Sequence, residues 1–450
     1  MSLRRERRQP RVFLGLQEIA GYYTRVRDGM LELGVAATFI DLSDHPFEYG
    51  HVESFPLARA IKSAMRRRQL ESPRSASAMR LLLWEIVLRL LLLIWAVFKF
   101  DFFIFGFGSS FLKRPLIDLK VLKFFRKRVV FVFHGSDARP AYLDGSIATD
   151  GQEGTARHFA DLARATEQRV SAIDRHADYI VDNALSAHFH KRPCVHWIVV
   201  GVPSVAPSND ALPNDEFVRS RRSVRILHSP SHPESKGTSR IRQAIVDVRA
   251  RGFEIEYVEI SGRPHADVLG ELMRCDLVVD QLYSDTPMAT FATEAAQFGK
   301  PAIVGGYGAL AFERMLPADA IPPVLYCHPD DLESSIERLV ADPTLRTAMG
   351  HAAQRFVESR WTQRDVAARL LRLLQGSCPE SWLFDPNEIR YCHGYGLNED
   401  QARGRVAEII AEGGVEALRL RDKPDLEDRL CNFARRKESP PLMPSCSSSF

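Results

Sequence analysis

The chain of 450 residues is longer than one ordinary hydrophobic core requires, so its length predicts two domains and an appendage. Hydrophobic residues make up 45% and charged residues 26% of it, which is typical of a soluble globular protein. Seven cysteines without a Cys-x-x-Cys pair favour a reducing compartment and argue against a disulfide scaffold or a zinc ribbon. The N-terminus lacks the apolar stretch of a secretory signal, so we expect a cytoplasmic protein.

The first 200 residues alternate short apolar runs with helical patterns. Strands are predicted at 11–14, 37–42, 101–106, 128–133 and 179–181. Helices are predicted at 21–33, 55–68, 79–98 and 154–174. This alternation predicts a parallel sheet with helices on both faces.

The predicted helix at 79–98 contains an apolar run that resembles a membrane span. Glu85 and Arg89 interrupt the run, and its longest uninterrupted part, 90–98, is much shorter than the roughly 20 residues of a span. The two charged residues are four positions apart, so they can pair on one helix face. We interpret the segment as a mostly buried helix; the alternatives are an interfacial helix and a true span.

Residues 202–222, which begin with a proline-rich stretch, are predicted to be a linker between the domains. After them the alternation restarts, with strands at 224–228, 254–259, 277–280, 302–304 and 324–327. Helices are predicted at 237–251, 266–274, 287–298, 330–341, 343–357 and 363–375. The expected fold class is α/β: two doubly wound, Rossmann-like domains (1–201 and 223–376) facing a cleft, a helical appendage (377–435) and a disordered tail (436–450).

Two segments carry most of the predicted chemistry. In the first, 228–238, a polar loop leads to Lys236, whose ammonium can bind a diphosphate together with the amides of Gly237 and Thr238 at a helix start. In the second, 293–301, Glu294 is expected near a helix start, where its carboxylate can accept two ribose hydroxyls. The ordinary alternatives are a solvated lysine and a glutamate stabilised by the helix dipole. Together the two segments predict a nucleotide-sugar site.

These segments, together with 20–23, 131–137 and 275–280, resemble the GT-B glycosyltransferases of the family-4 type. The resemblance extends over roughly residues 11–375. It implies a transferase of the EC 2.4 class that moves a sugar, with retention of configuration, from a nucleotide diphosphate sugar to a glycan or a lipid-linked glycan. It implies no cofactor beyond this co-substrate, and the base, the sugar and the acceptor are not readable from it.

The resemblance also implies roles for individual residues. It makes His134 and Asp137 catalytic, although either residue can instead serve only to end a strand or cap a turn. The donor-binding residues that it implies are Gly21, Gly135, Lys236, Gly237, Asp285, Thr286 and Glu294. Two departures from the family pattern are visible: Pro230 stands where a phosphate-binding arginine is usual, and Thr286, with Asp285 beside it, stands where a first acidic residue is usual.

Other motifs narrow the prediction further. No Asp-x-Asp occurs, and His188 and His190 point to different faces of a helix, so we expect transfer without a metal ion. The absence of nucleotide-binding glycine motifs weighs against redox chemistry and nucleoside triphosphate hydrolysis. The alternatives that stay open are a sugar-nucleotide epimerase and an inactive scaffold that binds a partner through 379–435.

The N-terminal part of the chain is basic. Residues 1–128 hold 23 Lys and Arg against 12 Asp and Glu, although the whole chain carries only +3. With the apolar helix at 81–98 and the run Arg66, Arg67 and Arg68, this excess predicts a peripheral contact with an anionic membrane rather than with nucleic acid. The alternative is an ordinary solvated surface.

Overall fold

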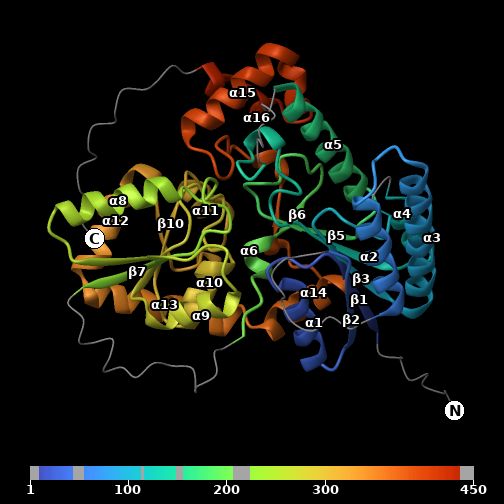
Figure 1. Ribbon diagram of the computed structural model, residues 1–450, viewed down its shortest axis with the longest axis horizontal. Coiled ribbons are helices and arrows are strands. Elements are labelled where there is room, and N and C mark those ends of the chain that lie inside the picture. The colour runs from blue at the N-terminus through green and yellow to red at the C-terminus, as the bar shows by residue number, and fades with distance from the viewer. Residues whose placement is uncertain (1–9, 44–54, 113–115, 148–155, 206–222, 436–450) are drawn as a thin grey trace.

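The computed structural model describes residues 10–43, 55–112, 116–147, 156–205 and 223–435. A seven-stranded sheet, in the order β12-β6-β5-β4-β3-β1-β2, organises the first half of the chain (Figure 1). Its parallel strands are β1 (Arg11–Leu16), β2 (Ala36–Asp41), β3 (Phe102–Gly106), β4 (Arg128–Val132), β5 (Tyr179–Asp182) and β6 (Cys194–His196). The chain winds in opposite directions from β1, so the predicted doubly wound sheet is confirmed.

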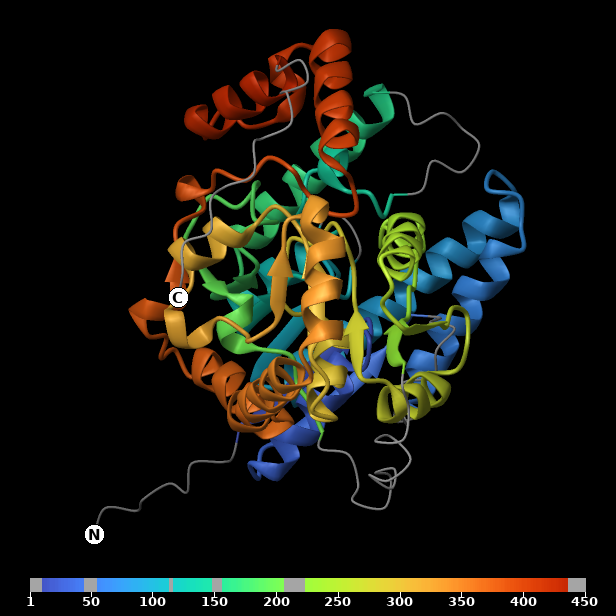
Figure 2. The ribbon, with the colours of Figure 1, turned by 90° about the vertical axis from the view of Figure 1, so that its left-hand side faces the viewer.

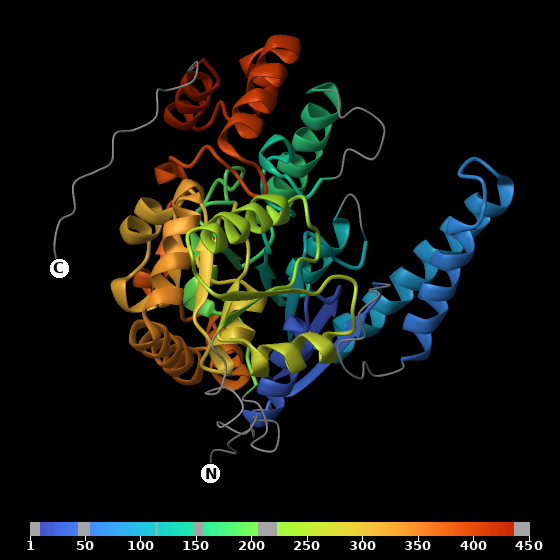
Figure 3. The ribbon, with the colours of Figure 1, turned by 60° about the vertical axis from the view of Figure 1, so that its left-hand side comes forward.

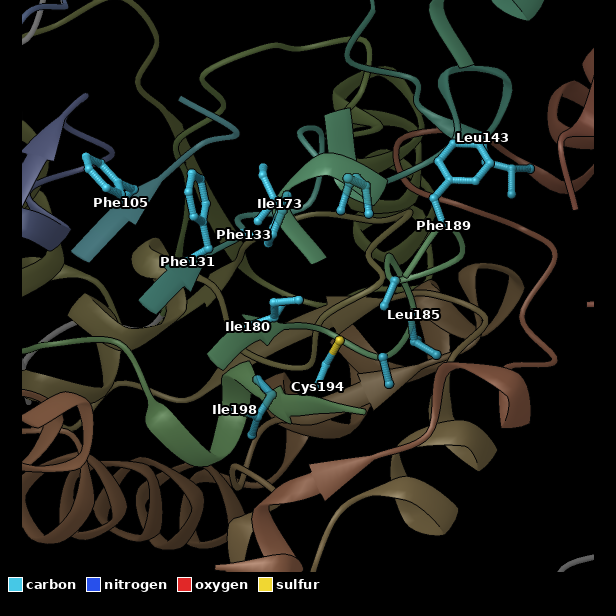
Figure 4. Close-up of a cluster of buried hydrophobic side chains, with 14 of the residues drawn as sticks. Phe105, Phe131, Phe133, Leu143, Ile173, Ile180, Leu185, Phe189, Cys194 and Ile198 are labelled. Atoms are coloured by element: carbon cyan, nitrogen blue, oxygen red, sulfur yellow. The ribbon is translucent and has the colours of Figure 1, made fainter. Parts of the chain in front are cut away.

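Alternating side chains of these strands build two cores. Phe105, Phe131 and Phe133 pack side by side on one face, with ring centroids 5.5 and 5.9 Å apart (Figure 4). The helices on this face are α2 (Pro56–Gln69), α3 (Ala76–Lys99), α4 (Ile117–Phe124) and α5 (Ala156–Asp174). Val12, Leu14 and other residues on the opposite face pack against α1 (Tyr22–Glu32) and α14 (Gln363–Leu374).

A second, five-stranded parallel sheet has the order β11-β10-β9-β7-β8. Its strands are β7 (Val224–His228), β8 (Ile255–Glu259), β9 (Leu277–Val279), β10 (Ala302–Gly305) and β11 (Leu325–Cys327). Helices α8 (Thr238–Ala250) and α12 (Leu332–Ala341) cover one face. Helices α9 (His265–Arg274), α10 (Thr290–Gln297) and α13 (Pro343–Arg360) cover the other, while α11 (Ala309–Met315) follows β10. This sheet is also doubly wound, as predicted.

The C-terminal helices return to the first half of the molecule. Helix α15 (Glu399–Gly413) packs against α5, and α16 (Pro424–Arg435) packs against α15 at one end of the molecule (Figure 2). The preceding strand β12 (Leu383–Phe384) pairs antiparallel with β6. Shorter helical turns are α6 (Trp197–Val200) and 3-10 helices at Ala141–Leu143, Ala318–Ala320, Pro329–Asp331, Glu380–Trp382, Pro386–Glu388 and Val415–Leu418.

The structure corrects three predictions. Helix α14, assigned to the second domain, packs its apolar side on the first sheet and crosses α1 so closely that a Cβ at Gly29 would lie 2.0 Å from the Gln363 carbonyl. Helix α10 begins at Thr290, one turn before Glu294. Helix α3 is not mostly buried, since only 39% of its apolar stretch is covered. The tail, and the linker except for residues 202–205, lie outside the described residues.

Short elements escaped prediction because they carry little periodicity. Helices α4 and α11 have eight and seven residues, and strand β6 has three. Patterns of this length match a strand, a helix or a loop equally well. Their positions are fixed by neighbouring elements rather than by their own sequence.

Candidate functional site

A cavity of about 360 Å³ lies at the carboxyl ends of β7, β8 and β9. These ends meet where the order of the second sheet reverses, which is the usual place for a ligand in an open α/β sheet. Ala20, from the loop after β1, brings the first half of the molecule to the same cavity. The second half lines it with Ser229, Pro230, Ser231, Lys236, Ile260, Ser261, Gly262, Arg263, His265, Val268, Asp280, Ala289, Thr290, Phe291 and Glu294.

Besides the exposed Arg263, the cavity is lined by a largely buried cation, Lys236. Its ammonium contacts Gln281 Oε1 and lies 3.7 Å from Asp280 Oδ1. Burial lowers the pKa of Lys236, but Tyr395 and Asp280 outweigh burial and raise it overall, so the ammonium stays charged. An anion entering the cavity therefore meets a fixed positive charge that is only partly neutralised by its neighbours.

A buried histidine fixes the loop that carries Lys236. His228, at the end of β7, has Nδ1 2.8 Å from the Val279 carbonyl and Nε2 2.9 Å from Thr238 Oγ1. Burial lowers its pKa to about 4, so the ring is neutral at pH 7. His228 thus ties the strands to the start of α8 and fixes the position of the lysine.

The amides at the start of α8 do not serve as predicted. Gly237 N donates to the Glu234 carbonyl and Thr238 N to the Pro233 carbonyl, both at 3.0 Å, so neither is free for a phosphate. Gly237 has φ 71°, and a Cβ there would lie 2.8 Å from Leu282 Cβ. The glycine is therefore required by the turn itself.

Glu294 is, beside Asp280, the second carboxylate that lines the cavity, and its side chain is only 5% exposed. His265 Nε2 lies 2.9 Å from its Oε1, and a guanidinium nitrogen of Arg25, on α1, lies 3.6 Å from the same oxygen. The two basic groups hold the carboxylate in place from both halves of the molecule. Sequence reasoning missed both, because neither stands in a motif and they meet Glu294 only in the fold.

The start of α10 faces the same cavity. Ala289, Thr290 and Phe291 are part of the lining, and among the described residues no side chain caps this helix start. The N–H groups of the first turn and the helix dipole favour an anion here. The predicted combination of helix start and cation is therefore present, but the helix is α10 rather than α8.

In the first half, the start of α1, which follows β1 as α8 follows β7, is closed. Gly21, with φ 78°, precedes α1, and the carboxylate of Glu18 accepts hydrogen bonds from the amides of Ile19, Tyr23 and Thr24. The Thr24 hydroxyl also donates to Glu18, at 2.6 Å. A chain carboxylate thus occupies the position in which a phosphate was expected near Gly21.

His134 follows β4 and contacts α1. Its Nε2 lies 2.9 Å from the Tyr23 hydroxyl, and its ring meets that of Tyr22 edge to face, with centroids 5.0 Å apart. Burial lowers the pKa of His134 to about 3, which leaves the imidazole neutral at physiological pH. His134, Gly135 and Asp137 are not in the lining of the cavity.

Asp137 caps the turn after β4. Its Oδ1 accepts from the His134 amide at 2.8 Å, whereas its buried Oδ2 has no hydrogen-bond partner among the described residues. Burial and the nearby Asp182 raise its pKa to about 7. Gly135, with φ 108°, belongs to the same turn, and a Cβ there would lie 2.8 Å from a guanidinium nitrogen of Arg139.

Asp285, expected to hold the donor sugar, is bound to Arg139 instead. Arg139 Nε donates to Asp285 Oδ2 at 3.0 Å, and a second nitrogen of Arg139 donates to Asp144 at 3.1 Å. All three side chains are buried, so the network joins the two halves away from solvent. Thr286 lies on the same loop with its amide bound to Ser284 Oγ, at 3.1 Å.

A segment of the C-terminal region passes between the two halves beside this network. Tyr395 N donates to the Leu143 carbonyl at 3.0 Å, and Gly396 N donates to the Tyr283 carbonyl at 2.8 Å. The Tyr395 ring lies 4.9 Å from the Arg139 guanidinium and 6.0 Å from the Lys236 ammonium. This segment was not predicted to be part of the site, because the family resemblance ends at about residue 375.

The histidines set aside as metal ligands have structural contacts. His190 lies between Asp174 and Asp182, at 2.7 and 3.2 Å, and these carboxylates outweigh the effect of burial and raise its pKa to about 9. His188 Nε2 lies 2.9 Å from the Tyr391 carbonyl. Within the described ranges, no three His, Cys, Asp or Glu side chains are grouped to hold a metal ion.

No family model and no curated protein matches the chain. Solved structures match it at low identity. HepE from Anabaena in complex with UDP is 12% identical, covering 82% of this chain and 100% of that one, with a TM-score of 0.48. A glycosyltransferase from Rickettsia africae is 10% identical (82% and 98% covered, TM-score 0.45), and a trehalose-6-phosphate synthase is 9% identical (83% and 100% covered, TM-score 0.48). At these identities and TM-scores, the matches themselves carry no argument. The fold is therefore assigned from the strand orders, and the function is argued from the site.

Proposed function

We propose that the protein is a GT-B glycosyltransferase of the family-4 type, which transfers a sugar from a nucleotide diphosphate sugar with retention of configuration. The observation that carries this proposal is the cavity at the reversal point of the second sheet, because one space holds the cation Lys236, the carboxylate Glu294 and the uncapped start of α10. The cation and the helix start fit a diphosphate, and the carboxylate fits the hydroxyls of a ribose, so the three features side by side fit a nucleoside diphosphate.

The lining suggests how the nucleotide lies. The ribose hydroxyls donate to Glu294, which His265 and Arg25 hold in place. The base packs against Ile260 and Val268 at the wall formed after β8. The diphosphate lies at the start of α10 and next to Lys236, where positive charge is already fixed.

The same groups account for the chemical step. As the bond between sugar and diphosphate breaks, negative charge grows on the leaving oxygen, and Lys236 and the α10 amides stabilise it. His134 is neutral, with a pKa of about 3, and lies outside the cavity lining with Nε2 bound to the Tyr23 hydroxyl, so its proposed role is to position the loop after β4 rather than to transfer a proton. The proposed step needs no metal ion, and the proposed acceptor is a glycan or a lipid-linked glycan.

One observation favours a second candidate, an inactive scaffold. The carboxylate nearest to the expected position of the first acid, Asp285, is bound through Oδ2 to two nitrogens of Arg139. A scaffold would bind a nucleotide sugar, or only its nucleotide part, without breaking it. An epimerase is less favoured because the cavity lining offers only Asp280 and Glu294 as acids, and each already has a basic partner.

The test combines binding with product analysis. Thermal shift against UDP-, GDP-, ADP- and TDP-sugars identifies the donor, because a ligand at 100 times its Kd stabilises the native state by about 2.7 kcal/mol. NMR of slow donor hydrolysis without acceptor, in excess EDTA, then reports the anomer first formed. Retention in EDTA supports the proposal; binding without turnover supports the scaffold, and inversion or a requirement for metal contradicts the proposed mechanism.

The control for this test is a matched pair of carboxylate variants. Glu294→Ala is expected to weaken donor binding ten- to a hundredfold, since a charge-assisted contact is worth about 1.5–3 kcal/mol. Glu333→Ala removes a carboxylate that pairs with Arg240 outside the cavity lining and is expected to bind the donor like the wild type. Equal affinity in both variants rules out this cavity as the donor site.

A further inference from the structure

A large apolar surface lies on the outer side of α3 and α4. Of the 18 large hydrophobic residues that are exposed in the described parts of the chain, 12 come from these helices and the residue after α4. They are Met79, Leu83, Trp84, Ile86, Val87, Leu90, Leu91, Ile94, Phe98, Ile117, Phe124 and Phe125. So strong a concentration on one side of a soluble fold marks an interaction surface.

The exposed residues form one continuous surface. On α3 they recur every three or four positions, so they share one face of the helix. The rings of Phe98 and Phe125 lie 6.2 Å apart and connect this face to α4. Helices α2 and α3 project from the body of the molecule as a hairpin, which leaves the face accessible (Figure 3).

The contacts of α3 show why it lies on a membrane rather than crossing one. By length and composition alone it is apolar enough to span a bilayer. However, its other side is part of the first core, through Leu88, Leu92 and Ala96. The buried Glu85 also binds Arg89, at 2.8 Å. Insertion across a bilayer would strip this core and carry the ion pair into hydrocarbon.

Basic side chains border the apolar surface. Lys99, Lys120, Lys123 and Arg126 are exposed beside its phenylalanines. Apart from burial, Lys123, Lys120 and Arg175 lower the pKa of nearby His176, which reports a positive field. The acidic residues of α3 and α4, Glu85 and Asp118, are buried. The surface thus combines apolar and positive groups without an exposed carboxylate on either helix.

We propose that this surface docks on an anionic lipid bilayer, with α3 lying in the interface and its apolar side chains among the upper acyl chains. The charge decides between this partner and a second copy of the chain, because a symmetric dimer would bring the lysines and arginines of both copies together. This docking surface differs from the one predicted around Arg66, Arg67 and Arg68, because Arg68 forms an ion pair with Glu85 at 3.2 Å.

Co-sedimentation of the full chain with vesicles tests the proposal. The wild type is expected to bind vesicles of phosphatidylcholine and phosphatidylglycerol, more weakly at high salt, and not to bind pure phosphatidylcholine. Trp84→Gln, Ile94→Gln and Phe98→Gln combined should weaken binding at least tenfold, since full burial of one such side chain alone corresponds to about that factor. Lys120→Ala, Lys123→Ala and Arg126→Ala should each weaken it about fivefold at low salt.

Exposed residues elsewhere supply the control. Val246→Gln with Leu310→Gln changes side chains that are 55% and 67% exposed on the second half, and should bind vesicles like the wild type. Melting temperatures show that each variant is folded. A protein that stays in the supernatant, an apolar variant that binds as well as the wild type, or a dimer that the apolar variant converts to a monomer would each overturn the proposal.

Discussion

The two sheets present their carboxyl ends in different states. In the first half, the polar groups there are bound to one another: Glu18 closes the start of α1, and Asp137 caps the turn that carries His134. In the second half, the start of α10 has no cap and faces a cavity together with Lys236 and Glu294. Two sheets of the same winding therefore present one closed edge and one edge with a cavity.

The contrast shows that the topology fixes where a ligand site can lie, whereas the side chains determine whether that site can bind a ligand. Both sheets reverse their strand order, and both bring a loop and a helix start to the reversal point. In the first half a single carboxylate satisfies the helix amides that a phosphate would otherwise bind. We infer that the first half orients the acceptor side and that charge stabilisation belongs to the second half.

The largest expected effect follows from removing Lys236 from the cavity. Lys236→Ala should lower the turnover of donor hydrolysis about a hundredfold, which is the usual cost of losing one group that stabilises developing charge. The change leaves the buried Asp280 without its cation, so the melting temperature must show that the variant is folded. Single-turnover rates measure the effect. Arg242→Ala, which removes a surface cation bound to Glu259, is the control and should leave the rate unchanged.

The second prediction concerns the closed helix start. Glu18→Ala leaves the amides of Tyr23 and Thr24 without their acceptor and should reduce the free energy of unfolding by about 1–2 kcal/mol, as for other lost caps. Chemical denaturation measures it. Because the donor is held by the second half, the donor Kd should change little. A gain in donor affinity of tenfold or more would show that the phosphate reaches α1, and it would contradict the contrast between the two halves.

Much of this arrangement was predictable from the sequence, and the limits have physical causes. Lys236 was predicted because it lies in the loop after a strand, and Glu294 because it lies in a helix that ends at a glycine. Both patterns are local in the sequence, so they are read without knowledge of the tertiary structure. Arg25, Arg139 and Tyr395 were missed because their partners lie in other segments of the chain. The role of Asp285 was misjudged for the same reason, since an aspartate beside Thr286 gives no sign of the arginine that it binds.

The third prediction uses the neutral state of His134. Its pKa is lowered from 6.5 to about 3, so the unfolded chain binds the proton more tightly and stability falls as pH falls through 6.5 towards 3. His134→Asn should reduce this loss of stability in acid. It should lower turnover less than tenfold and leave the pH profile between 5 and 8 unchanged. If the pH profile of turnover changes slope near pH 6.5 in the wild type but not in the variant, His134 acts as a general acid or base.

The smallest effect is expected at Tyr395, which lies between the two halves. Its hydroxyl is 3.4 Å from Gln281 Oε1, a weak contact, so Tyr395→Phe should change donor affinity less than twofold. Its ring lies near both Arg139 and Lys236, and Tyr395→Ala removes this cation–π contact, which is worth about 0.5–1 kcal/mol at exposed sites. We therefore expect a three- to fivefold loss of donor affinity for Tyr395→Ala, measured by calorimetry. If Tyr395→Phe binds the donor as weakly as Tyr395→Ala does, the hydroxyl rather than the ring supports Lys236. A gain of affinity in Tyr395→Ala would instead identify the 391–397 segment as a competitor of the donor for the cavity, and the contrast between a closed and an open half would no longer hold.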